Sequence, residues 1–393
     1  MQLQLPTSTN ALSHRAQTST ALSAHPTSNV APICLQSPLH RISLDLNQTD
    51  MDSHRQKLYD QPSPGLRHSY STGHIANGKI KTQHTITSDV PIHYEPVMLK
   101  SSHSKQLLHG RLWRAQTLDN QPAQGVVSIV HGMGEHSGCY DTLAHQLTQQ
   151  HFNVICIDHR GHGLSQGGRG ELVHYDQLHQ DVRDHLAFAK ASFPKQPISL
   201  YAHSMGGGLV LDHLHRFAND KHLQDLQKII VTSPWIRLKT PYAPLASAIV
   251  WAMLKSNYNP VFSMGQALKP NPNRIPTQDP LCQGKISARW FLGAEDAGSR
   301  TMRQAHTLPS TISDKLTLIH CADDGLTNPK TTQAFANKTN THFIGMKNMG
   351  HSPHVTHQRS AFFDIITHLL PSKPALITQP RSAQEIEPNV THP

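Results

Sequence analysis

The sequence has little of what defines several large classes of protein. Only 16% of its 393 residues are charged and 6% are aromatic, which excludes coiled coils and acidic disordered chains. No apolar run approaches the roughly 20 residues that a transmembrane helix needs. No basic segment followed by an apolar stretch opens the chain, so no secretory signal peptide is expected. The five cysteines include no Cys-x-x-Cys pair, which argues against a disulfide framework and favours a reducing compartment.

Histidine, proline and glycine are instead abundant, with 31, 27 and 23 copies. The net charge is +9 and the isoelectric point is near 9.3. This mild basic excess suits an anionic membrane surface or an anionic head group. Nucleic acid is not an expected partner, because the sequence has no cluster of Lys and Arg, no aromatic RNA-binding motif and no zinc-finger spacing.

The two ends of the chain differ in composition from the middle. Residues 1–90 are rich in Ser, Thr, Gln, His and Pro and have no sustained apolar periodicity. Such a segment buries too little apolar surface to offset its loss of conformational entropy. We therefore predict disordered polar tails at residues 1–90 and 371–393.

Strand-like and helix-like patterns alternate between these tails. Short apolar runs predict strands at residues 97–99, 107–113, 126–130, 154–157, 198–202, 229–232, 316–319 and 343–344. Apolar residues at helical spacing lie between most of these runs. The alternation predicts an α/β fold, a mostly parallel sheet flanked by helices. The core would comprise residues 91–234 and 295–370.

Residues 235–294 interrupt the alternation, and we predict an inserted helical cap or lid there. Within this insertion the stretch Tyr242–Leu254 is almost entirely apolar. It could form a helix inside the cap that is buried on all of its faces. Alternatively, its apolar face could contact a membrane or guide an acyl chain.

A serine at the junction of a predicted strand and a predicted helix is the candidate nucleophile. The strand at 198–202 leads directly into Ser204, which is followed by Met205 and three glycines. A tight turn of this kind exposes the serine hydroxyl and directs the backbone N–H of the next residue, Met205, toward a developing oxyanion. Ala202 stands where a Gly-x-Ser-x-Gly motif has its first glycine, and its extra methyl group should be tolerated.

A serine nucleophile needs a base, and the base needs a carboxylate that orients it. After such a serine, the acid and then the base follow in chain order. Asp324 follows the predicted strand at 316–319, and His351 follows the strand at 343–344. Asp323 is an alternative to Asp324 as the acid.

A second oxyanion donor is expected from the loop after an earlier strand. The sequence Gly132-Met133-Gly134 follows the strand at 126–130, and its glycines allow the backbone N–H of Met133 to approach Ser204. The histidines at 159–163 and 351–357 suggest a metal site, but no second ligand group at standard spacing accompanies them. We expect neither a metal ion nor a cofactor.

Three motifs give the sequence a family resemblance that extends over about residues 95–370. They are HGMGEHSG at 131–138, DHRGHGLS at 158–165 and HSMGG at 203–207, and the stretch DPLCQGKISARW adds to them. Together they resemble the monoacylglycerol lipase and lysophospholipase (L2-type) group of α/β-hydrolases. The resemblance implies Ser204 as nucleophile, Asp324 as acid, His351 as base, and Met133 and Met205 as oxyanion donors. Cys139 departs from the group, which usually has Arg at that position.

The sequence thus predicts an α/β-hydrolase that cleaves the carboxylic ester of a single-acyl lipid, either a lysophospholipid or a monoacylglycerol. We expect it to be cytoplasmic or peripheral on the inner face of the membrane, which its cap would contact. The oligomeric state is not predicted. The alternatives are an esterase, thioesterase or peptidase that uses the same triad, and a catalytically silent lipid-binding module.

Overall fold

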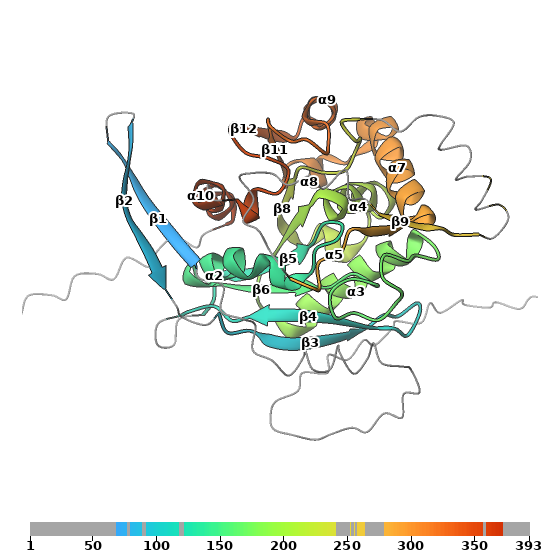
Figure 1. Ribbon diagram of the computed structural model, residues 1–393, viewed down its shortest axis with the longest axis horizontal. Coiled ribbons are helices and arrows are strands. Elements are labelled where there is room, and N and C mark those ends of the chain that lie inside the picture. Colours follow the sequence, from blue (N-terminus) through green and yellow to red (C-terminus); the bar gives the residue numbers. More distant parts are fainter. Residues whose placement is uncertain are drawn as a thin grey trace, which may run out of the picture.

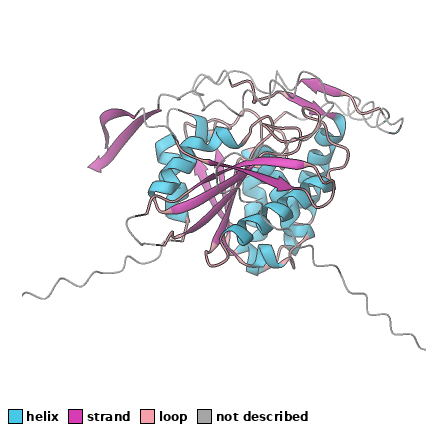
Figure 2. Ribbon diagram, turned by 90° about the horizontal axis from the view of Figure 1, so that it is seen from below, coloured by secondary structure: helices cyan, strands magenta, loops and turns pink. Residues whose placement is uncertain are grey.

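The computed structural model describes residues 68–76, 79–88, 92–117, 122–240, 252, 255, 258–263, 279–356 and 359–371. Within these ranges an eight-stranded sheet lies between two layers of helices (Figures 1 and 2). No helix in the described ranges has both the length and the apolar character needed to cross a membrane.

The strands of the main sheet follow the order β12-β11-β8-β7-β5-β6-β4-β3. They are β3 (Glu95–Lys100), β4 (Leu107–Trp113), β5 (Gly125–Val130), β6 (Phe152–Ile157), β7 (Ile198–His203), β8 (Leu226–Thr232), β11 (Leu316–Cys321) and β12 (His342–Met346). The β3–β4 hairpin pairs antiparallel with β6, and the other neighbouring strands are parallel. Every residue of β5, β6, β7 and β11 is buried, as expected for strands covered on both faces. The predicted α/β fold with a mostly parallel sheet is confirmed.

The helices divide between two apolar layers. On one face, α2 (Asp141–Gln149) and α10 (Arg359–Leu369) pack against the sheet. The other face is covered by α3 (Asp176–Ser192), α4 (Ser204–Arg216), α7 (Ala288–Arg303) and α9 (Pro329–Thr339). The remaining elements are short: α5 (Lys221–Gln224), α8 (Ser310–Ser313), and the 3-10 turns η1 (Ser137–Tyr140), η2 (Ala305–Thr307) and η3 (Pro353–Val355).

Part of the segment predicted to be a disordered tail has regular backbone structure. Strands β1 (His68–Ala76) and β2 (Lys79–Ser88) pair antiparallel, with Ala76 opposite Lys79. Two residues therefore connect the strands, and the sequence there is Asn77-Gly78, the dipeptide most favoured in two-residue hairpin connections. Residues 1–67 and 372–393 lie outside the described residues.

The predicted cap is described only in part. Its described part includes β9 (Val261–Ser263) and β10 (Lys285–Ser287), which pair antiparallel. Of the apolar stretch Tyr242–Leu254, all but Ala252 lies outside the described residues.

Helix α7 spans the predicted boundary between cap and core at residues 294 and 295. Its apolar side chains Trp290, Phe291 and Ala294 join the buried layer that includes α4. At Gly298 a Cβ atom would lie 2.1 Å from the backbone oxygen of Ile236, so the helix approaches the core closely there. In the structure the core therefore resumes at the start of α7, several residues before the predicted boundary.

Candidate active site

Ser204 lies at the sharp turn between β7 and α4. Its φ of 53° falls in the left-handed region, which costs a residue with a side chain about 1–3 kcal/mol unless its surroundings hold it there. The carbonyl of Ser204 accepts a hydrogen bond from the N–H of Trp235 (2.9 Å). Gly206 allows the close approach of the neighbouring loop, because a Cβ atom at that position would lie 2.4 Å from the backbone oxygen of His131. The turn is thus fixed by its neighbours, and position 206 has no room for a side chain.

Three loops bring Ser204, His351 and Asp324 together. His351 follows β12, and its Nε2 accepts a hydrogen bond from the Ser204 hydroxyl at 2.7 Å. Its Nδ1 donates to Asp324 Oδ2 at 2.8 Å. The imidazole side chain is 16% exposed, whereas Asp324 is fully buried. Because β7, β11 and β12 run parallel, their carboxyl ends share one edge of the sheet, where the three side chains meet.

The Asp324 carboxylate has a complete set of hydrogen-bond donors. Oδ1 accepts from the backbone N–H groups of Leu326 (2.7 Å) and Thr327 (2.9 Å). Oδ2 accepts from the Thr327 hydroxyl (2.7 Å) and from His320 Nε2 (3.1 Å), in addition to His351. Burial alone would raise the pKa of Asp324, but the charge of His351 and the hydrogen bonds from His320 and His351 outweigh it and hold the pKa well below its usual range. These contacts therefore favour the ionised form of the carboxylate.

Asp323, the alternative acid, has an exposed side chain. Its backbone N–H donates to the carbonyl of Met349 (3.2 Å). The contact with His351 is made by Asp324.

Of the two predicted oxyanion donors, Met205 directly follows the serine and Met133 lies on a loop that approaches it. Met205 is the second residue of α4, and the N–H groups in the first turn of a helix have no partner within the helix. Met133 lies on the loop after β5, which is held by a hydrogen bond from the N–H of Gly132 to Glu135 Oε2 (2.8 Å). The Cα of Gly132 faces Ser204, since a Cβ built on it would lie 3.1 Å from Ser204 Cβ.

A buried ionic cluster beside the triad was missed by the sequence reasoning. Its centre is Glu135, which also accepts a hydrogen bond from the Tyr140 hydroxyl (2.7 Å) and contacts His203 Nδ1 and His354 Nε2, each at 3.2 Å. Burial would raise the pKa of Glu135, but the charges of His203 and His354 and their hydrogen bonds hold it well below its usual value.

His203 connects this cluster to the base. Its Nδ1 donates to Glu135, and its Nε2 donates to the backbone carbonyl of His351 at 3.0 Å. An imidazole that donates from both nitrogens is protonated. Burial lowers the pKa of His203, but the charge of Glu135 and the two hydrogen bonds overcome this and raise it. Nothing in the local sequence pairs a glutamate at 135 with the histidine before the nucleophile, because the pairing forms only when β5 and β7 become neighbours.

The turn at residues 158–165, considered at the sequence level as a metal site, is held by protein contacts. Asp158 accepts from the backbone N–H groups of Ser137 (2.6 Å) and Leu164 (2.9 Å). Arg160 forms a two-point ion pair with Asp181, at 2.8 and 2.7 Å. The turn thus has a structural role within the core.

Residues 121–358, more than half of the chain, match the Hydrolase_4 family, which is described as serine aminopeptidase, S33. The chain belongs to this family. Its sequence also groups it with the monoglyceride lipases among the α/β-hydrolases, which confirms the family predicted from the motifs. It is 27% identical over 205 residues to the monoglyceride lipase of Rattus norvegicus, which corresponds to 50% of this chain and 64% of the rat protein.

Other relatives match a smaller share of their own length. An uncharacterized abhydrolase domain-containing protein of Dictyostelium discoideum is 30% identical over 253 residues, 62% of this chain but 26% of that protein. This α/β-hydrolase therefore spans less than two thirds of the length of these relatives.

Solved structures agree with the fold. The Paleococcus ferrophilus monoacylglycerol lipase aligns with a TM-score of 0.55 and 21% identity, covering 66% of this chain and 97% of that one. A soluble variant of the Saccharomyces cerevisiae monoglyceride lipase, in complex with a substrate analogue, aligns with a TM-score of 0.55 and 20% identity over 70% of this chain and 93% of that one.

Proposed function

We propose that this α/β-hydrolase is a serine hydrolase that cleaves the carboxylic ester of a single-acyl lipid. The observation that supports the proposal most directly is the alignment of Ser204 Oγ, His351 and Asp324 through hydrogen bonds of 2.7 and 2.8 Å. A serine hydroxyl is a weak nucleophile, and an adjacent imidazole held by a buried carboxylate is the arrangement that activates it.

In the proposed reaction, Ser204 Oγ attacks the ester carbonyl while His351 Nε2 takes the hydroxyl proton. The tetrahedral oxyanion is stabilised by the backbone N–H groups of Met133 and Met205. His351 then returns the proton to the leaving alcohol, and an acyl-enzyme on Ser204 remains. A water molecule, deprotonated by the same imidazole, attacks the acyl group, releases the fatty acid and restores Ser204. Asp324 stays ionised throughout and stabilises the imidazolium.

Glu135 and His203 support this chemistry from outside the reacting atoms. The hydrogen bond from His203 Nε2 fixes the backbone carbonyl of His351, and that from Gly132 to Glu135 fixes the loop of Met133. Donors and base that are held in place before the substrate binds need no reorganisation during the reaction.

The proposed substrates are monoacylglycerols and lysophospholipids, which share one acyl ester and differ in the head group. Relatives named monoglyceride lipase favour the glycerol head group. The net charge of +9 suits an anionic head group or an anionic membrane surface, so we also propose peripheral contact with a membrane through the cap.

The test is hydrolysis by the purified chain of matched monoacylglycerols, lysophospholipids, short p-nitrophenyl esters and aminoacyl p-nitroanilides. We expect turnover of the monoacyl lipids, and labelling of the wild-type protein but not of Ser204→Ala by a fluorophosphonate probe. Turnover restricted to the anilides would instead indicate a peptidase, in line with the family description. If the probe fails to label the folded wild-type chain, the proposed hydrolase activity is wrong, and the alternative of a catalytically silent lipid-binding module is favoured.

A further inference from the structure

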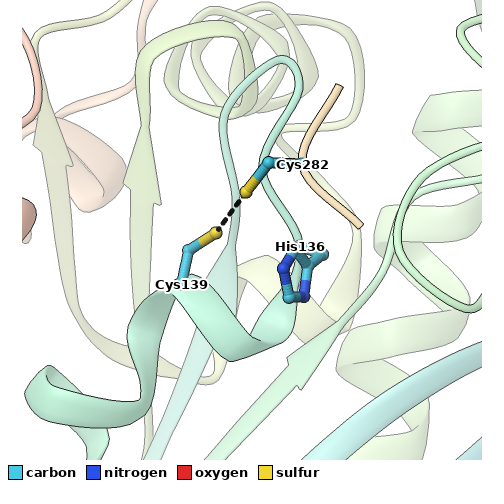
Figure 3. Close-up of side chains that lie close together, drawn as sticks. All are labelled: His136, Cys139 and Cys282. Atoms are coloured by element: carbon cyan, nitrogen blue, oxygen red, sulfur yellow. Dashed lines mark hydrogen bonds between the residues drawn. The ribbon is translucent and has the colours of Figure 1, made fainter. Parts of the chain in front are cut away.

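A cluster of metal-binding side chains lies outside the proposed catalytic machinery. It joins the turn η1, which contains Cys139 and is preceded by His136, to the segment before β10, which contains Cys282 (Figure 3). Asp279, on the same segment as Cys282, contacts His136. The imidazole and the two thiols each present one ligand atom, and the three atoms all lie within 4.8 Å of one another. His136 is buried and the two cysteines are half-buried, so the cluster lies at the edge of the protein.

The two segments present their side chains in the same way. In the first, the N–H of Cys139 donates to the carbonyl of His136 (2.9 Å); in the second, the N–H of Cys282 donates to the carbonyl of Asp279 (3.2 Å). Each turn is also closed by the side chain of its first residue. His136 Nδ1 accepts from the N–H two positions later at 3.2 Å, and Asp279 Oδ1 accepts in the same manner at 2.9 Å.

In each turn, one side-chain atom of the first residue closes the turn, and its other nitrogen or oxygen faces the opposite turn. His136 Nε2 and Asp279 Oδ2 lie 2.9 Å apart, and the Sγ atoms of Cys139 and Cys282 lie 3.5 Å apart. The imidazole also contacts Cys282. The nitrogen of His136 and the two sulfurs thus converge within 4.8 Å of one another, and the Asp279 carboxylate contacts this group through His136.

These separations match the edges of a tetrahedral zinc site. Zn–S bonds of about 2.3 Å place two sulfurs about 3.8 Å apart, and Zn–N and Zn–O bonds of about 2.0–2.1 Å place those two atoms about 3.3 Å apart. The observed separations are a few tenths of an ångström shorter, so the ion enters with small side-chain rotations. Binding through Nε2 places the ring proton of His136 on Nδ1 and releases the 3.2 Å hydrogen bond from Gly138. The donor set also suits zinc, because thiolates and imidazole select it over magnesium and calcium, which prefer oxygen ligands.

We propose that His136, Cys139 and Cys282 bind one Zn²⁺ ion, with the Asp279 carboxylate as the fourth ligand. The ion links two segments 143 positions apart in the sequence and reinforces the backbone hydrogen bond from Gln283 to the carbonyl of Gly134 (2.9 Å). It holds the end of the cap segment against the loop that carries Met133. Its role is structural, since all four ligand positions are filled by protein.

Spectroscopy with Co²⁺ as a probe tests the site independently of catalysis. The full chain is stripped of metal with a chelator, kept reduced, and titrated with Co²⁺ and then with Zn²⁺. We expect one equivalent of Co²⁺ to bind with the intense visible bands of a tetrahedral ion and a near-ultraviolet thiolate-to-metal band, and Zn²⁺ to displace it. The Ser204→Ala protein should give the same spectra, which separates this site from the proposed hydrolase.

Variants distinguish the proposed ligands from other thiols. Cys139→Ser and Cys282→Ser should each weaken the thiolate-to-metal band and the binding, and Asp279→Asn should weaken the binding by about 10- to 100-fold. Cys156→Ala is the matched control, because Cys156 is a buried cysteine of β6 outside the cluster, and it should bind Co²⁺ like the wild type. Zn²⁺ should also raise the melting temperature of the wild type but not of the two serine variants.

Either of two results would overturn the proposal. The first is Co²⁺ binding that is weak, octahedral or unchanged in the serine variants. The second is a protein isolated without chelator that contains no zinc and has Cys139 and Cys282 joined in a disulfide, as detected by peptide mass spectrometry.

Discussion

Buried histidines should make the folded state sensitive to mild acid. His159, His162 and His185 are buried, and burial lowers their pKa values to about 4, 3 and 3, with the charge of His159 contributing to the shift of the other two. In the unfolded chain a histidine has a pKa of about 6.5. Between pH 6.5 and the folded-state values, the unfolded chain therefore binds protons that the folded chain does not, and acid favours unfolding.

The size of the effect follows from the separation of the two pKa values. Each of these histidines costs about 1.4 kcal/mol of stability for each pH unit below 6.5, which is about 2 kcal/mol between pH 8 and pH 5. His203 acts in the opposite direction, because its pKa is raised in the folded state and acid therefore favours folding through this group. The total loss is therefore smaller than the sum over the lowered groups, and a single substitution gives the cleaner measurement.

The variant His185→Gln removes one buried titratable group, so its comparison with the wild type measures the contribution of that group alone. The His185 ring lies on α3, with Nε2 at 3.2 Å from the Ser128 hydroxyl, and glutamine supplies a neutral polar group of similar size. Urea unfolding at pH 8 and pH 5 should show that the wild type loses about 2 kcal/mol more than the variant over that interval. His306→Gln, at an exposed position, is the control and should behave like the wild type. Equal pH dependence in the wild type and His185→Gln would refute the reasoning.

Three further predictions concern the triad, the serine turn and a buried ion pair. Asp324→Asn should lower kcat on a p-nitrophenyl ester by about 10⁴-fold, because the amide favours the wrong tautomer of His351. Asp323→Asn should change kcat by no more than about twofold. If Asp323→Asn is the more damaging change, Asp323 is the acid. Gly206→Ala should abolish turnover and lower the melting temperature, since its Cβ would lie 2.4 Å from a backbone oxygen; wild-type activity would show that the turn has room. Arg160→Met should lower the free energy of unfolding in urea by about 3–5 kcal/mol, because it leaves the buried Asp181 without its ion-pair partner. The double variant with Asp181→Leu should recover part of this loss. No recovery would contradict the argument.

The sequence predicted the features that depend on local pattern and chain order. The strands were recognisable because buried parallel strands are short apolar runs, and β5, β6 and β7 are of that kind. Ser204, Asp324 and His351 were proposed because each follows a predicted strand, although the strand before His351, β12, is buried only at its last residue. The structure brings these three residues into contact, and their roles remain predictions.

The features that were missed depend on tertiary contacts. Glu135 and His203 are 68 positions apart, and His136 and Asp279 are 143 apart, so no local spacing connects them. The β1–β2 hairpin has a local signal in Asn77-Gly78, but the polar composition around it outweighed that signal. The predicted boundary at residue 294 falls inside α7, whose packing against α4 depends on tertiary contacts that no local pattern indicates.

The cap segment is tied to the core at both of its ends. Near its N-terminal end, the N–H of Lys239 donates to the carbonyl of Leu326 (2.8 Å). Near its C-terminal end, the Gln283 side chain donates to the carbonyl of Gly161 (3.0 Å). Both anchors are contacts with the core, and neither involves residues 241–278. Between them, β9 pairs with β10 and the carbonyl of Pro260 accepts from the N–H of Ala288, so we expect insertions and deletions confined to residues 264–278 to leave these contacts and the serine turn unchanged. Divergence among descendants of this fold should concentrate there, and chimaeras joined at these two anchors are the natural route to redesigned selectivity.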